Sequence, residues 1–169
     1  MLINHYVNGK PLNQTGFSMI EVLVTVLILS FGLLGMANLI TTGMRANTAA
    51  QFRSIATQQT LDMADRMRAN LAGVRAGSYD AIAASIPAAN DCFAAICDEG
   101  QIATYDQAQW NTTNAAALPN GSGTVTVDPS NPNEFLITLT WLEKDRGGAA
   151  IAACGNVPDT NCFLTRISP

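Results

Sequence analysis

A long apolar run begins at Phe17, and its only charged residue is Glu21. No charged residue follows until Arg45. The uncharged stretch would form about 34 Å of α-helix, slightly more than the roughly 30 Å hydrocarbon core of a bilayer. The alternative is a buried core helix, but the rest of the chain is too small and polar to surround such a rod. The pattern therefore predicts a transmembrane helix over 17–43.

The helical pattern continues past this run and becomes amphipathic over 44–71. Apolar residues recur near one face there, and charged residues lie on the others. The apolar positions are Phe52, Ala56, Met63, Met67 and Leu71. No proline occurs within 17–86, and Gly73 is a suitable helix stop. We expect one helix over 17–71, roughly 80 Å long, with its second half packed into a globular core.

An alternation with a period of two residues begins in the last third of the chain. It covers 124–127, stops at a Pro- and Asn-rich turn over 128–133, and resumes over 135–142. This arrangement is typical of a β-hairpin. The segment CFLTRIS at 162–168 predicts a third strand. An antiparallel sheet is therefore expected within 123–168.

The connection between helix and sheet, residues 73–122, is rich in Ala, Gly, Asn and Ser. We expect it to be irregular, with one or two short helices such as 79–86 and 104–110. Together the elements predict an α+β fold, in which a long N-terminal helix packs on a small antiparallel sheet. The expected divisions are a leader (1–16), a membrane helix (17–43) and a head (44–169), whose first part (44–72) is the amphipathic half of the helix.

The first 16 residues differ from the apolar run that follows them. They are mostly polar, contain His5 and Lys10, and end in Gly16. A secretory signal peptide has the opposite order, because its apolar core precedes a small-residue cleavage site. The order here is a short polar leader that ends in glycine, followed by an apolar segment.

Cysteine usage indicates the compartment better than charge does, because the positive residues on the two sides of the span are nearly balanced. Cys92, Cys97, Cys154 and Cys162 all follow the span, in a polar and loop-rich region. Four such cysteines suggest disulfides formed in an oxidising compartment. The bulk of the chain is therefore expected outside the cytoplasm.

The spacing of the cysteines favours two local disulfides, Cys92–Cys97 and Cys154–Cys162. Closing either short loop would stabilise the fold by roughly 2–3 kcal/mol in the chain-entropy model. Cross-pairing between the two segments is one alternative. A zinc site is another, but zinc usually requires closer cysteine pairs or added histidines.

The segment GFSMIEVLVTVLILSFGLLGMA, which starts at Gly16, resembles the class III leader of the type IV pilin family. More narrowly, the chain is similar to minor pilins of the PilV type. This similarity rests on MADRMRAN at 63–70, ALPNGSGTVTV at 117–127 and ITLTWLEKD at 137–145. The first motif is specific for the superfamily, and the later three are individually weaker. Unlike many major pilins, the chain lacks a proline near Asn38 and a glycine near Ser30.

The resemblance implies that a membrane-embedded prepilin peptidase cleaves after Gly16 and that the new Phe17 amine is N-methylated. Glycine suits such a position, because it permits close approach of an enzyme to the backbone. The resemblance also implies that Glu21 neutralises the terminal amine of a neighbouring subunit during assembly. Without the motif, Glu21 is equally well explained as an acid that reaches the lipid headgroups or favours the helix N-terminus.

The residue inventory offers little support for catalysis or nucleic-acid binding. The only histidine is His5, in the expected leader, so the rest of the chain lacks Ser–His and Cys–His pairs. No Gly-rich phosphate loop is present, and beyond Arg45 acidic residues outnumber basic ones. A local patch of Arg66, Arg68 and Arg75 is the remaining candidate for phosphate contacts. We expect no catalytic residues, no cofactor and no metal ion.

The resemblance implies a minor type IV pilin that is stored in the inner membrane with its head in the periplasm and then joins the pilus. Its expected role is to help prime pilus assembly, with a place near the tip. Its expected partners are the prepilin peptidase, other minor pilins and a tip adhesin. One alternative is a minor pseudopilin of a type II secretion system, which shares the leader chemistry. Another is a single-pass membrane receptor with a periplasmic binding head, which would keep its leader.

Overall fold

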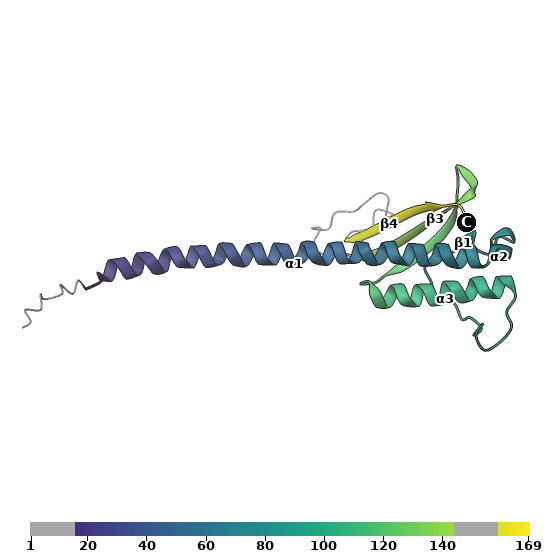
Figure 1. Cartoon of the computed structure of the whole chain (residues 1–169), viewed down its shortest axis with the longest axis horizontal. Coiled ribbons are helices and arrows are strands. Elements are labelled where there is room, and N and C mark those ends of the chain that lie inside the picture. The colour runs from purple at the N-terminus through teal and green to yellow at the C-terminus, as the bar shows by residue number, and fades with distance from the viewer. Residues whose placement is uncertain (1–15, 144–158) are drawn as a thin grey trace, which may run out of the picture. The chain divides into compact units, whose positions relative to one another are not determined.

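The computed structural model describes residues 16–143 and 159–169. The chain divides into two compact units, Met1–Gly43 and Met44–Pro169. Helix α1 (Met19–Ala69) contributes to both units (Figure 1). The predicted long helix is therefore confirmed, with both ends two residues inside the expected bounds. In the first unit, all described side chains are exposed.

The second unit is an α+β head, as the sequence predicts. Its sheet has four strands in the order β1-β2-β3-β4, and each neighbouring pair is antiparallel. The strands are β1 (Ala81–Ile82), β2 (Ser122–Asp128), β3 (Asn131–Leu142) and β4 (Thr160–Ile167). Alternate residues of β3 are buried from Phe135 to Trp141, so one face of the sheet packs against the helices.

The core of the head lies between this face of the sheet, the second half of α1, and helix α3 (Glu99–Ala117) (Figure 1). Its members from the helices include Ala56, Met63, Met67 and Trp110, and those from the sheet include Val125, Ile137 and Leu139. The two predicted core methionines are fully buried. Leu71 was expected on the same stripe but is 41% exposed, because α1 ends before reaching it.

Asn70 separates α1 from the short helix α2 (Leu71–Arg75). Its Oδ1 accepts a hydrogen bond from the Gly73 backbone N–H at 3.1 Å, and its Nδ2 donates to the Glu99 carbonyl at 2.8 Å. Gly73 therefore lies inside α2, and its prediction as a helix stop is wrong. The reason for glycine is close packing, since a Cβ at this position would lie 2.5 Å from Asn70 Nδ2.

The region 73–122 is more regular than expected, because α3 is a 19-residue helix that extends well beyond the predicted 104–110. Asp98 and Gln101 form a capping box at its start. The Gln101 N–H donates to Asp98 Oδ1 at 2.7 Å, and the Asp98 N–H donates to Gln101 Oε1 at 3.1 Å. The alanines of α3 also favour the helix, because alanine has the highest helix propensity of any residue.

Two smaller expectations also require correction. The helix expected over 79–86 is absent, and β1 in that range instead pairs with residues 125 and 126 of β2. The turn expected over 128–133 is shorter, because Asp128 and Asn131 are already paired, with an irregularity in register next to them. Both differences depend on hydrogen bonds between segments, which a local pattern does not encode.

Candidate processing and assembly site

The residues predicted for processing lie where the chain enters α1. Gly16 and Phe17 are not helical, and Phe17 is 85% exposed. Glu21 lies in the first turn of α1, where its backbone N–H donates to the Ser18 carbonyl at 3.0 Å. An accessible, non-helical peptide bond therefore precedes the carboxylate by about one helical turn.

The carboxylate of Glu21 has no cation in its own segment. Residues 16–43 contain no Lys, Arg or His. Cleavage after Gly16 would place a cationic amine on Phe17, which would be the first positive charge in this apolar segment. A carboxylate in a medium of low dielectric gains strongly from such a partner.

The apolar part of α1 has a surface suited to lipid or to other helices. Within the described residues, α1 is the one helix long and apolar enough to cross a membrane. Its few hydroxyl groups are satisfied within the helix. Thr25 Oγ1 donates to the Val22 carbonyl at 2.8 Å, and Ser30 Oγ donates to the Val26 carbonyl at 2.7 Å. These bonds remove the penalty of an unpaired polar group in hydrocarbon.

Comparison with known families places a processing signal on these same residues. Residues 11–37 match the family described as the prokaryotic N-terminal methylation motif. The chain is a type IV pilin-like protein. This motif is the prepilin leader, and it contains Gly16, Phe17 and Glu21. No curated protein and no solved structure matched the chain.

The prepilin leader of this pilin-like chain implies processing by a prepilin peptidase and assembly with other pilins. Together with the apolar helix it indicates membrane anchoring followed by incorporation into a pilus. The motif also indicates a structural protein. In the part of the chain that the structure describes, no group of His, Cys, Asp and Glu side chains is arranged to hold a metal ion.

The second unit contains the predicted cysteines. A disulfide joins Cys92 to Cys97, with an S–S distance of 2.04 Å and a Cα–Cα distance of 5.5 Å. It closes a short loop just before α3. Cys162 lies in β4. Cys154 lies outside the described residues, so the Cys154–Cys162 pairing stays a prediction.

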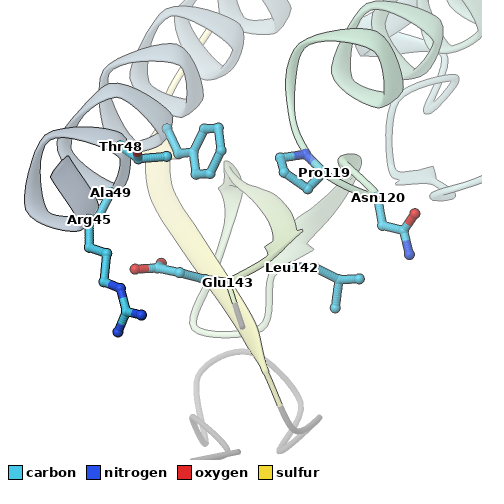
Figure 2. Close-up of a pocket in the computed structure, with 8 residues that line it drawn as sticks. Arg45, Thr48, Ala49, Pro119, Asn120, Leu142 and Glu143 are labelled. Carbon is cyan, nitrogen blue, oxygen red and sulfur yellow. The ribbon is translucent and has the colours of Figure 1, made fainter. Parts of the chain in front are cut away.

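The head also contains a groove that the sequence analysis did not anticipate (Figure 2). It has a volume of about 410 Å³. One wall is α1, with Arg45, Thr48, Ala49 and Phe52, and the other consists of Pro119, Asn120, Leu142 and Glu143. A hydrogen bond from the Leu142 N–H to the Pro119 carbonyl, 2.8 Å long, holds the second wall together. The described lining of the groove combines the apolar side chains of Phe52 and Leu142 with the charged side chains of Arg45 and Glu143.

A buried polar cluster connects α1, α3 and Tyr79. The Tyr79 hydroxyl donates to Asp106 Oδ2 at 2.5 Å, and Arg66 Nη1 donates to Asp106 Oδ1 at 3.2 Å. Burial, and then the hydrogen bond to Asp106, raise the pKa of Tyr79. Arg66 also pairs with Asp62 at 2.8 Å. The members of this cluster are up to 44 positions apart in the sequence, so no local spacing indicates that they meet. Their polar and ionisable side chains are the only signal that the sequence offers.

The same ion pairs bear on the predicted arginine patch. Arg66 faces the carboxylates of Asp62 and Asp106, and Arg68 pairs with Asp65 at 2.9 Å. Two of the three arginines thus already have anionic partners within the head. A nucleic-acid phosphate would have to compete with these carboxylates.

Proposed function

We propose that the chain is a minor type IV pilin of the PilV type. In this proposal it is stored in the inner membrane with its head in the periplasm, helps to prime pilus assembly with other minor pilins, and takes a place near the tip beneath an adhesin. The observation that carries the proposal is the methylation motif over residues 11–37. The ordered resemblance of segments 63–70, 117–127 and 137–145 to minor pilins supports the narrower assignment.

The chemistry of the motif explains why cleavage and assembly are linked. Before cleavage, Glu21 is an acid in an apolar segment without a cation. Cleavage creates the Phe17 amine, and a neighbouring subunit presents the same pair of groups. Docking of two such helices places amine against carboxylate in a medium of low dielectric, where the attraction is strong. The exposed apolar side chains around them then pack on neighbouring helices instead of lipid.

A minor pseudopilin of a type II secretion system would share this motif. An experiment in cells distinguishes that role from the role of a minor pilin. Deletion of the gene should reduce surface piliation and leave type II secretion of its usual exoproteins at the parental level. The opposite result, with normal pili and a secretion defect, would assign the chain to a secretion system.

The first prediction concerns the mature N-terminus. Mass analysis of the membrane-purified protein should find Phe17 as the first residue, with a methyl group on its amine. A Gly16→Val variant should keep the leader, because a branched side chain hinders approach of the peptidase to the backbone. A wild-type protein that retains Met1 as its dominant membrane form would refute the proposal and favour a membrane receptor.

A further inference from the structure

Among the described residues of the head, Phe93 and Ile96 have the most exposed large apolar side chains. Their exposed fractions are 90% and 101%, whereas the next most exposed large apolar side chain among the described residues of the head is Met44, at 67%. Both residues lie inside the loop closed by the Cys92–Cys97 disulfide, which we call the Cys92–Cys97 loop. Two almost fully exposed apolar side chains three positions apart in one short loop are unfavourable unless something covers them.

The loop holds these side chains in a defined conformation. Besides the disulfide, the Asp91 carbonyl accepts hydrogen bonds from the N–H groups of Ala94 and Ala95, at 3.1 and 3.0 Å. Asp91 Oδ1 accepts a further bond from the Phe93 N–H at 3.0 Å. The Phe93 ring packs edge to face on Tyr105 of α3, with 5.9 Å between ring centroids. Such preorganisation lowers the entropy lost when an apolar side chain enters a binding pocket.

The charges around the loop indicate what kind of surface could cover it. Asp91, Asp98 and Glu99 flank the apolar residues, and the segment from Asp91 to Glu99 contains no Lys or Arg. None of these three carboxylates forms an ion pair with a basic side chain of the described residues. An anionic lipid surface would repel this acidic border. A protein pocket with an apolar floor and basic residues at its edge would complement both features.

We propose that the Cys92–Cys97 loop docks into another protein, with Phe93 and Ile96 in an apolar pocket whose rim carries Lys or Arg. The partner in this proposal is a different protein, because a second copy would bring its own net negative charge, with 13 acidic against 9 basic residues. This inference goes beyond the proposed function, since it rests on the loop alone and does not require that the chain be a minor pilin.

The test uses the full-length chain in its native membrane, with the photo-reactive residue p-benzoylphenylalanine in place of Phe93 or Ile96. A matched control carries it in place of Leu164, a partly exposed apolar residue of β4. Irradiation at positions 93 and 96 should give an adduct with the same protein, at least roughly tenfold above the Leu164 control, as expected for a hot-spot contact. Mass mapping should place the adduct on apolar residues that have Lys or Arg beside them.

A charge reversal tests complementarity separately. Glu99→Lys should lower the adduct yield from position 96 several-fold, whereas Glu134→Lys, which changes an acid on β3, should not. Thermal unfolding of both variants shows whether the head remains folded, and a folded Glu99→Lys head with an undiminished yield would overturn the proposal. Adducts only with lipid, only with a second copy of the chain, or equally from Leu164 would overturn it as well.

Discussion

At the scale of single residues, Asn111 joins three segments of the head. Its side chain is 1% exposed. Its Oδ1 accepts from the Gly123 N–H at 2.7 Å, and its Nδ2 donates to the Gly123 carbonyl at 3.2 Å and to the Ala83 carbonyl at 3.0 Å. Helix α3 is thereby fixed to β2 and to the chain that follows β1. Buried amides with complete hydrogen bonding make such an arrangement specific.

Gly123 is packed beneath the neighbouring Trp110 indole, and this contact gives a prediction at the residue scale. A Cβ on Gly123 would lie 2.1 Å from Trp110 Cη2, so Gly123→Ala should displace a fully buried ring. We expect the free energy of unfolding of the head to fall by about 1–3 kcal/mol, as measured by denaturant unfolding of the full chain in detergent.

Gly100→Ala is the matched control for this substitution. A Cβ there would meet its nearest neighbour at 3.6 Å, an ordinary contact, and Gly100 lies in α3. Alanine is the better helix former, so this variant should be neutral or slightly more stable. Equal effects of the two substitutions would show that the Trp110 contact does not limit packing at Gly123.

At the scale of elements, Asp128 connects the β2–β3 turn to β4. Its Oδ1 accepts from the Ser130 N–H at 2.8 Å, and its Oδ2 accepts from Arg166 Nε at 2.6 Å. The backbone bond from Ser130, and then the bond from Arg166, lower the pKa of Asp128. The folded head thus favours the ionised form of this carboxyl relative to the unfolded chain.

The prediction at this scale is that the stability of the head depends on pH in the acid range. Because the folded pKa lies below the unfolded value of about 3.9, the stabilisation is present above that value and is lost as the pH falls through the folded pKa. The difference in free energy of unfolding between wild type and Asp128→Asn should therefore shrink between about pH 5 and pH 2. Denaturant unfolding at several pH values measures it.

Asp65→Asn is the control for the acid experiment. Asp65 pairs with Arg68 on the exposed face of α1, and its side chain is 75% exposed. Exposed pairs contribute little, so this variant should follow the wild-type pH profile closely. Parallel pH profiles for wild type and Asp128→Asn would contradict the assigned role of Asp128.

At the scale of the whole molecule, the proposed role of Glu21 is to couple the apolar helix to assembly with other subunits. We expect Glu21→Ala to insert, fold and be cleaved normally, because the substitution makes the segment more apolar. It should nonetheless be lost from purified pili and from minor-pilin complexes, since the Phe17 amine of a neighbour would lack its counter-charge. The head should unfold at the wild-type temperature, because Glu21 belongs to the other compact unit.

Ser30→Ala serves as the control in the same segment. It removes a hydroxyl that is already bonded to the Val26 carbonyl and changes no charge, so recovery in pili should be normal. If Glu21→Ala is present in the membrane, cleaved, and recovered in pili at the wild-type level, charge pairing is wrong for this subunit. Glu21 would then act at the helix N-terminus or at the headgroups.

The local pattern alone determined the elements whose signal is carried by neighbouring residues. The apolar run with Glu21, the amphipathic stripe with Met63 and Met67, and the alternation of β3 each repeat over many positions. Burial on one face of a helix or strand requires such a repeat, so the long helix and the hairpin could be predicted. The methylation motif is likewise contiguous, and it led to the pilin resemblance.

Tertiary structure decided the features that depend on segments distant in sequence. Strand β1 is too short to show an alternation of apolar and polar residues, and it forms because it pairs with β2. The length of α3 follows from its capping box together with the burial of Trp110 and Asn111. The cluster of Tyr79, Asp106 and Arg66 forms because the fold brings three separate segments together. Contacts between residues distant in sequence stabilise these features. Such contacts form only when the chain is folded, so the local sequence does not reveal them.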